Sequence, residues 1–332
     1  MLKIGNLVLK APFVQAPLSG YSDYAMRRLA LDFGAPLTFA GVMLAKSAAH
    51  PKILKKPEFQ PHDDEHPIGA QIFGDDPSIM SKAAKDLQAA GYDIIDLNFS
   101  CPTPKVVSRK RGGWMMTDPE NVIQVYKSVR DAVTCPVTIK LRVGFDSSSE
   151  SYDKFYDIVS ETSRLNIDAL TIHGRTVAQR FSGPGNWDII AKIKNEFPKT
   201  TIIGSGDLFE PQEIINRLKT ANLDGVQIAR GAIGNPWIYR GLNAILEGKP
   251  VPNAPTLDEQ AEIIRKHFEI ICRLYDKKKS VWYFRKFSVR YCRLHPLRKH
   301  VQRSLLAASS GKELLDAIDH WYSNNNSEIG NS

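Results

Sequence analysis

The stretch LNFSCPTP, residues 97–104, places a cysteine just beyond a short apolar run. The run ends at Asn98, and Cys101 stands beside a proline in a segment that continues with Lys105 and Arg109. A thiol is mostly protonated at neutral pH and can deliver a proton, whereas nearby cations favour the thiolate. We therefore treat Cys101 as a candidate catalytic acid, with a small packing residue as the alternative.

Polar side chains end several other apolar runs in the same manner. They are Gln71 (run 68–74), Asn98 (93–99), Lys140 and Arg142 (136–144), His173 and Arg175 (168–175), Ser205, Gly206 and Asp207 (201–207), and Arg230 (225–231). Lys140 and His173 end neighbouring runs, where a cation and a hydrogen-bonding group could face an anionic ring such as a reduced flavin. The alternative for His173 is a buried core histidine.

Two turns of small residues, GSGD (204–207) and ARGAIGNPW (229–237), each lead into a helical stretch. In barrel enzymes the loops after strands seven and eight often hold a phosphate with backbone N–H groups. Arg230 could add a bidentate contact to such a phosphate. The alternative is that the glycines only allow tight turns. No GxGxxG motif follows the first run, so a Rossmann dinucleotide site is not expected.

The runs themselves set the fold class. Eight β-rich runs lie at 12–17, 37–42, 68–74, 93–99, 136–144, 168–175, 201–207 and 225–231, and helical stretches separate most of them, at 77–90, 119–133, 153–165 and 211–220. This even alternation predicts an α/β fold of the (β/α)8 TIM-barrel type, with a doubly wound sheet as the alternative. In such a barrel the carboxyl ends of the strands meet on one face, which gathers the polar residues above.

The chain changes character after Gly248, where KPVPNAPT reads as a linker. We place the barrel in residues 1–245, a C-terminal all-helical bundle in 246–322, and a polar disordered tail in 323–332. The bundle is expected to contain helical segments at 257–276, 283–295 and 311–322.

Much of the positive charge is concentrated in this bundle. Residues 273–303 hold eleven Lys or Arg and one acid, and they are interleaved with Tyr275, Trp282, Tyr283, Phe284, Phe287 and Tyr291. A solvated face is one interpretation, but the excess of cations and aromatic rings favours an RNA-binding surface. The candidate RNA contacts there are Lys277, Lys278, Lys279, Arg285, Lys286, Arg290 and Arg293.

Composition limits the remaining classes. The chain has 332 residues and a formal net charge of +8, and no apolar stretch approaches the roughly 18 residues of a membrane span. The first residues lack the apolar block of a signal peptide, so we expect a soluble, cytoplasmic protein. None of the four cysteines forms a CxxC pair, so neither a metal site nor a disulfide framework is expected.

Ordered motifs along the chain resemble those of the tRNA-dihydrouridine synthases. They are APLSGYSDYAMRRL (16–29), GAQIFGDDP (69–77), IDLNFSCPTPKV (95–106), VTIKLRVGFD (137–146), LTIHGRTVAQRFSGPGNWDII (170–190) and IARGAIGNPWIY (228–239). The segment 170–190 is the most specific of these matches. Overall length and the C-terminal extension most resemble the bacterial B-type branch.

The resemblance implies an FMN-containing barrel that reduces specific uridines of tRNA to 5,6-dihydrouridine, with NADPH as the reductant of the flavin. Hydride would reach C6 of the uracil, and Cys101 would protonate C5. The implied FMN contacts are Ala16, Pro17, Leu18, Gln71, Lys140, His173, Ser205, Gly206, Asp207, Ala229 and Arg230. Asn98 and Arg175 would lie near the reacting uracil or the flavin, and Arg142 is assigned to the substrate. A uracil inside folded tRNA must be extruded to reach such a pocket.

Three residues depart from the family pattern and keep alternatives open. Ser205 replaces an asparagine, Ser100 replaces a glycine before the cysteine, and Trp114 stands on the catalytic loop. Because of Ser100, NFSCP also resembles the FMN-dependent dihydroorotate dehydrogenases, although HGRT and the basic bundle disfavour that assignment. A non-catalytic tRNA-binding protein is the third alternative, but it would have lost Cys101, Lys140 or His173, and all three are present.

Overall fold

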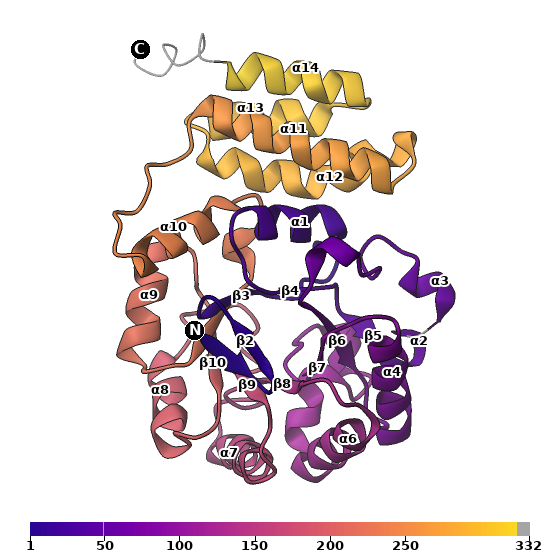
Figure 1. The fold of residues 1–332 in the computed structure, drawn as a ribbon, viewed down its shortest axis with the longest axis vertical. Helices are drawn as coiled ribbons and strands as arrows, with labels where there is room; N and C mark the ends of the chain where they lie inside the picture. The colour runs from indigo at the N-terminus through magenta and orange to yellow at the C-terminus, as the bar shows by residue number, and fades with distance from the viewer. Residues whose placement is uncertain (49, 324–332) are drawn as a thin grey trace.

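The computed structural model describes residues 1–48 and 50–323, and its centre is a nearly closed barrel of parallel strands (Figure 1). The strands are β3 (Phe13–Gln15), β4 (Thr38–Phe39), β5 (Met43–Leu44), β6 (Ile68–Phe73), β7 (Ile94–Asn98), β8 (Val137–Arg142), β9 (Ala169–His173), β10 (Ile202–Ser205) and β11 (Gly225–Ile228). They are hydrogen-bonded in the order β3-β11-β10-β9-β8-β7-β6-β4. The N–H of Gln15 donates to the Leu37 carbonyl at 3.0 Å, which links the two ends of the sheet. The predicted TIM barrel is confirmed.

Helices cover the outside of the strands. They are α1 (Tyr24–Asp32), α2 (Ala45–Ala48), α3 (Pro51–Leu54), α4 (Pro77–Ala89), α5 (Pro104–Val107), α6 (Pro119–Ala132), α7 (Ser149–Arg164), α8 (Trp187–Glu196), α9 (Pro211–Thr220) and α10 (Trp237–Leu246). Single 3-10 turns lie at Asp63–Glu65 (η1), Gly112–Thr117 (η2) and Arg230–Ala232 (η3). α7 begins four residues before the predicted start at residue 153, because the Ser148 hydroxyl accepts a hydrogen bond from the Ser151 N–H at 3.2 Å and caps the helix there.

The composition of residues 37–42 predicted one strand. The structure instead has two short strands there, β4 and β5, with an interruption between them. β4 pairs with the first residues of β6, and β5 pairs with the last two. Between them the Gly41 N–H donates to the Glu58 carbonyl at 3.2 Å instead of to β6. Beyond this interruption Val42 lines the cavity at the mouth of the barrel.

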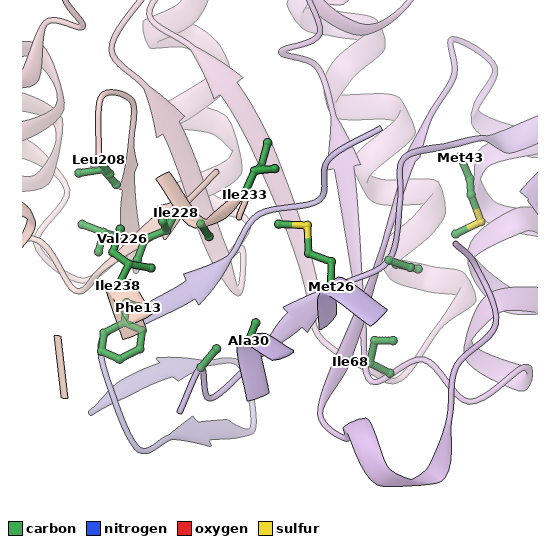
Figure 2. Close-up of a cluster of buried hydrophobic side chains, with 14 of the residues drawn as sticks. Phe13, Met26, Ala30, Met43, Ile68, Leu208, Val226, Ile228, Ile233 and Ile238 are labelled. Carbon is green, nitrogen blue, oxygen red and sulfur yellow. The ribbon is translucent and has the colours of Figure 1, made fainter. Parts of the chain in front are cut away.

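Two apolar layers hold the barrel together. A small inner cluster, which includes Leu2, Ile4 and Ile203, is covered at the amino-terminal end of the strands by the hairpin β1 (Leu2–Ile4) and β2 (Leu7–Leu9). The larger cluster lies between strands and helices, and Figure 2 shows Val226 and Ile228 of β11 near Ile238 of α10. The hairpin thus closes the amino-terminal end of the barrel.

The C-terminal region folds into four helices and not the three segments predicted. They are α11 (Leu257–Leu274), α12 (Lys277–Tyr291), α13 (Arg298–Ala307) and α14 (Gly311–Tyr322), with a 3-10 turn, η4 (Cys292–Leu294), after α12. α13 escaped prediction because only Val301 and Leu305 of its ten residues are buried, which leaves too few apolar positions for a clear helical period. Residues 324–332 of the predicted tail lie outside the described part of the chain.

The helical bundle packs on α1 (Figure 1). Phe287 of α12 meets Tyr21 edge to face at 5.5 Å between ring centroids, and Lys266 of α11 pairs with Asp32 at 2.8 Å. Apolar residues of the bundle belong to the same buried cluster as those of the barrel. The bundle and barrel therefore share one continuous core.

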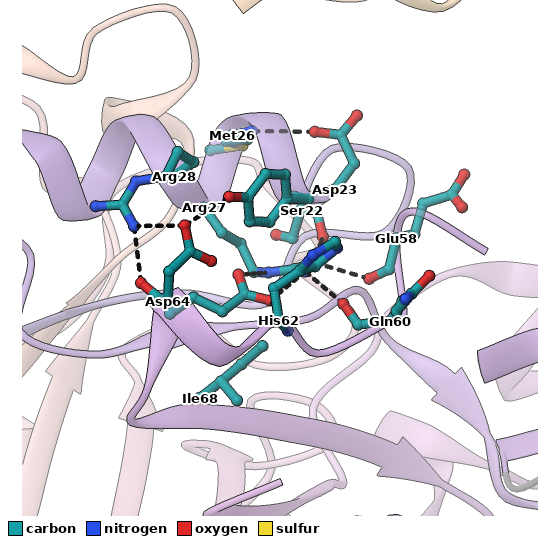
Figure 3. Close-up of polar contacts among 12 residues, drawn as sticks. Ser22, Asp23, Met26, Arg27, Arg28, Glu58, Gln60, His62, Asp64 and Ile68 are labelled. Carbon is teal, nitrogen blue, oxygen red and sulfur yellow. Dashed lines mark hydrogen bonds and ion pairs between the residues drawn. The ribbon is translucent and has the colours of Figure 1, made fainter. Parts of the chain in front are cut away.

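A buried ion pair fixes the start of α1. The guanidinium of Arg27 donates to both carboxylate oxygens of Glu65 at 2.8 Å, and both side chains are fully buried. Arg27 also donates to the backbone carbonyls of Ser22, Glu58 and Gln60 (Figure 3). One side chain thus ties the segment 58–65 to the helix on which the bundle packs. No helix in the described residues is long and apolar enough to cross a membrane.

Candidate active site

A cavity opens at the carboxyl ends of the strands, as the placement of polar residues in the sequence predicted. Its lining includes Ala16, Pro17, Leu18, Gln71, Asn98, Cys101, Lys140, Arg142, His173, Ser205, Gly206, Asp207, Ala229 and Arg230. Among the residues predicted for this pocket, only Arg175 stands behind the wall, and it supports residues that line it. Residues from seven strands and the loops after them therefore meet at one place.

A chain of hydrogen bonds runs from the barrel interior to the candidate acid. Buried Asp96 accepts hydrogen bonds at 2.5 Å from Gln71 Nε2 and from Thr138 Oγ1. The Gln71 amide is thereby oriented so that its Oε1 accepts from Asn98 Nδ2 at 2.7 Å. Asn98 Oδ1 in turn accepts from the backbone N–H of Cys101 at 3.0 Å. The Asp96 carboxylate therefore orients the side-chain amide of Gln71, which orients that of Asn98, which in turn holds the backbone N–H of Cys101.

Lys140 carries a buried cation that has no hydrogen-bond partner in the described structure. Its Nζ atom is inaccessible to solvent, and the residue lines the cavity. Burial lowers the pKa of Lys140 to about 8, although the Asp96 carboxylate opposes that shift. An ammonium group held this way is suited to a ligand that brings negative charge or a hydrogen-bond acceptor.

His173 is held neutral beside Lys140. Burial, followed by the charges of Lys140 and three neighbouring arginines, lowers the pKa of His173 to about 2. Its Nε2 lies 3.3 Å from Nη1 of Arg175, and since a guanidinium can only donate, Nε2 accepts and the proton sits on Nδ1. A side chain at Gly206 would touch the imidazole, with its Cβ 3.4 Å from Nε2, so glycine keeps that side of the ring open.

Asp207 organises the arginines behind the pocket. Both of its oxygens accept from Arg175 Nη2 at 2.8 Å, and one accepts the Gly185 N–H at 2.9 Å. Arg230 lies 3.7 Å from the same carboxylate and faces the ring of Phe181 at 5.0 Å. Burial alone would raise the pKa of Asp207, but these hydrogen bonds and charges leave it below its ordinary value. The carboxylate remains ionised and fixes both arginines.

Arg142 holds the loop of Cys101 in place and lines the pocket as well. It donates to the Ser100 carbonyl at 2.9 Å and to the Thr176 carbonyl at 2.7 Å. Farther along the loop the Gly113 N–H donates to the Cys101 carbonyl at 2.9 Å, and a Cβ at Gly113 would stand 2.7 Å from Val177. The glycines before Trp114 are thus required by close packing against Cys101.

The predicted RNA contacts of the bundle divide into two groups. Arg290 lies against the loop that follows Arg230, since a Cβ at Gly234 would stand 2.7 Å from the Cβ of Arg290, and Arg293 follows in η4. The charges of Arg290 and Arg230 add to burial in lowering the pKa of Arg293. Lys279 is exposed at the start of α12, and the side chains of Lys277 and Lys278 lie outside the described residues. Within the described chain Arg290 and Arg293 form no ion pair, so an anionic partner would relieve their repulsion.

Two predicted RNA contacts are used inside the protein instead. The ammonium of Lys286 donates to the Gly20 carbonyl and lies over the rings of Tyr21 and Phe287, so it joins the bundle to the barrel. Arg285 donates to the Ala308 carbonyl at 3.0 Å. Both side chains therefore already have partners within the protein, and their contact with RNA stays a prediction, because the sequence shows the charge of a helix but not which face packs.

The aromatic residues of α12 also serve mainly in packing. Phe284 and Phe287 are fully buried against His267, and Tyr291 donates or accepts a hydrogen bond with the same histidine at 2.8 Å. Trp282 is the exception, with 66% of its surface exposed. The alternation of aromatic residues and cations therefore reflects an amphipathic helix whose aromatic face is mostly buried. Only the cations of this helix support RNA binding.

Sequence reasoning missed several residues of the site, and four of them bear on its chemistry. They are Asp96, Thr138, Phe181 and Phe209. Asp96 and Thr138 point into the barrel at alternate positions of their strands, a signal that polar residues within the apolar runs could have given. Phe181 and Phe209 lie in loops, where sequence carries no comparable periodicity.

The fold and the site together define a (β/α)8-barrel protein with an anion-accepting pocket at the carboxyl ends of its strands. Residues 14–326 match the family model of the dihydrouridine synthases (Dus), and the chain belongs to that family. Of the two families that NFSCP resembles, this membership favours the dihydrouridine synthases over the dihydroorotate dehydrogenases.

Curated relatives agree with the family model. The chain is 32% identical to a probable tRNA-dihydrouridine synthase of Rickettsia conorii over 85% of this chain and 84% of the relative. It is 30% identical to tRNA-dihydrouridine synthase B of Pasteurella multocida, over 97% and 96% of the two chains. Among solved structures, histamine dehydrogenase from Rhizobium sp. 4-9 shares the barrel fold, with a TM-score of 0.58, 16% identity, and coverage of 81% of this chain and 50% of that one.

Proposed function

We propose that this protein reduces uridines of tRNA to 5,6-dihydrouridine, with FMN as the bound cofactor and NADPH as the reductant. The observation that carries the proposal is the cavity that joins Cys101, Lys140 and His173 in a chain of the dihydrouridine synthase family. Arg230 lines the cavity, Arg290 lies against the loop that follows it, and Arg293 is exposed close by in the chain, which supports a polyanionic substrate.

The pocket residues fit a flavin phosphate and ring. Lys140 offers a buried ammonium without a partner, and neutral His173 lies next to it with its open face toward Gly206. The loops 205–208 and 229–231 line the same cavity, where their backbone could receive a phosphate together with Arg230. When bound, the reduced flavin supplies the hydride for C6 of the uracil.

Cys101 holds the proton for C5 in this proposal. Its sulfur is 3.3 Å from Thr103 Oγ1, and its backbone N–H is fixed by Asn98. Arg142 fixes the Ser100 carbonyl on the other side of the same turn. The thiol is thus presented to the cavity by a loop that is anchored on both sides, while Asn98 and Arg175 stand near the place proposed for the uracil.

We expect Asp96→Leu to slow dihydrouridine formation roughly tenfold or more, because the Gln71 amide then loses the acceptor that orients it. Asp96→Asn should retain more activity, since its amide oxygen can still accept from Gln71. Thr138→Val, which removes only the second donor to Asp96, is the matched control. Equal single-turnover rates for Asp96→Leu and Thr138→Val would show that Asp96 does not position the site.

We expect FMN affinity to fall as the pH rises through about 8, the lowered pKa of Lys140. Below that pH the lysine is protonated and attracts the anionic ligand, and above it the charge is lost. Lys140→Met should bind FMN about 10- to 100-fold more weakly at pH 7, as expected for a lost charge-assisted hydrogen bond. Its FMN affinity should also lack the fall near pH 8. Fluorescence titration between pH 7 and 9.5 measures both, and an identical step in Lys140→Met would rule out Lys140 as its source.

The experiment that tests the proposed function is NADPH oxidation by the purified protein with FMN added, under anaerobic conditions. We expect oxidation to depend on tRNA that lacks dihydrouridine, and to stop when fully modified tRNA is supplied instead. Oxidation that responds to orotate and not to tRNA would refute the proposal in favour of a small pyrimidine substrate.

A further inference from the structure

The barrel carries a second set of exposed cations, beside the pocket and outside the helical bundle. Residues 45–57 contain Lys46, Lys52, Lys55 and Lys56 and no acid, and all four side chains are exposed. Residues 103–111 of the catalytic loop likewise contain no acid, and Lys105, Arg109 and Lys110 are exposed there. We call these seven residues the lysine rim.

The two halves of the lysine rim adjoin each other and the pocket. Lys46 and Arg111 line the same small hollow, which Asp75 and Asp76 also line, and Arg111 pairs with Asp75 at 2.8 Å. Val42, four residues before Lys46, lines the active-site cavity, and so does Thr103, which directly precedes α5. The parts of the rim next to Val42 and Thr103, which hold Lys46 and Lys105, therefore lie close to the cavity that Cys101 lines, and the rest of the rim extends away from it.

The cations of the rim have no ion-pair partner within the described part of the chain. By contrast, Lys82, Lys154 and Arg217 on the outer helices each pair with an acid four residues away. A solvated helical face commonly mixes both signs in this way. A row of like charges beside a pocket raises the local concentration of anions.

The rim continues toward the basic bundle. The Tyr24 N–H, at the start of α1, donates to the Pro57 carbonyl at 3.1 Å, and Lys286 of α12 lies 3.9 Å from Asp23 beside it, so the segment that holds Lys55 and Lys56 ends close to α12. Lys279 is exposed near the start of α12. Figure 1 shows α3 and the corner between α11 and α12 on the same side of the molecule.

We infer that the lysine rim binds the phosphate backbone of the RNA whose base enters the pocket. The inference rests on the proposed function, and it adds a contact surface on the barrel to the one on the bundle. Phosphates recur along an RNA strand on both sides of any extruded base. A row of cations near the pocket has the opposite charge and could contact several successive phosphates. The rim and the cluster of Arg230, Arg290 and Arg293 would then hold the strand on separate sides of the opening.

The test is the salt dependence of tRNA binding by a variant with Lys46→Gln, Lys52→Gln, Lys55→Gln and Lys56→Gln. The plot of log affinity against log salt should flatten by about 0.7–0.9 for each phosphate that the variant no longer neutralises, and binding at moderate salt should weaken roughly tenfold or more. The matched control replaces four exposed lysines of the outer helices and their loops, Lys127, Lys192, Lys199 and Lys219, by glutamine. It should keep the wild-type slope and affinity.

Equal slopes for the rim variant and the control would overturn the inference. So would a rim variant that binds tRNA normally but has a raised KM for NADPH, since the rim would then serve the dinucleotide phosphates. Flavin content and the denaturation midpoint confirm that each variant is folded. Because tRNA binding is measured directly, the result is independent of turnover, so failure of the rim and failure of the proposed reaction are distinguishable.

Discussion

Cys101→Ala is expected to lower the rate of dihydrouridine formation by about 10²–10⁴-fold, the usual contribution of a positioned general acid. The cysteine lines the cavity, and its loop is fixed by hydrogen bonds to Asn98 and Arg142. No other thiol lines the cavity, so none can replace it within the described structure. Rapid-quench measurement of dihydrouridine in a single turnover gives the rate of the proton-transfer step.

The same variant should keep its FMN and the rate at which NADPH reduces it, because the thiol's hydrogen bond goes to Thr103 on its own loop. Cys135→Ala is the control, since Cys135 is also a partly buried free cysteine but lies before β8, at the closed end of the barrel. Wild-type turnover in Cys101→Ala would remove the cysteine as the acid. Loss of flavin from that variant would instead indicate a structural role.

Glu65→Gln is expected to lower the free energy of unfolding by about 3–5 kcal/mol, because it leaves the guanidinium of Arg27 buried without its counter-charge. Both side chains of this pair are fully buried, and the same guanidinium holds three backbone carbonyls of neighbouring segments. Urea denaturation followed by circular dichroism measures the loss.

Two controls separate the buried charge from the loss of any ion pair. Glu161→Gln breaks an exposed pair with Arg164 and should cost less than about 1 kcal/mol. The double variant Arg27→Met with Glu65→Leu removes both buried charges and should regain much of the stability that Glu65→Gln loses. A Glu65→Gln protein as stable as Glu161→Gln would contradict the account.

The barrel could be predicted from sequence because its strands and helices alternate at even spacing, and because the polar residues fall at the ends of the strands. Lys140, His173 and Asp207 were found in this way, each near the end of an apolar run. Prolines at residues 77, 119 and 211 marked the starts of α4, α6 and α9 correctly, since proline suits the first helical turn.

What could not be predicted depends on contacts between distant segments. Gly41 leaves the sheet because the Glu58 carbonyl is available to it, and Lys286 turns inward because Gly20 and the ring of Tyr21 lie opposite. In the sequence Asp96 is one polar residue within an apolar run. Its hydrogen bonds to Gln71 and Thr138 form only because neighbouring strands bring these residues to it. A charge count finds the basic bundle but cannot tell a surface cation from one in an interface.

The most direct test of the central claim is the dihydrouridine content of tRNA, measured by mass spectrometry. The tRNA would come from cells that lack their own dihydrouridine synthases, and it would be incubated with this protein, FMN and NADPH. We predict that a defined uridine gains the mass of two hydrogens, and that Cys101→Ala gives little or none of this product. A protein that binds FMN and accepts electrons from NADPH, yet leaves every uridine unchanged, would contradict the claim.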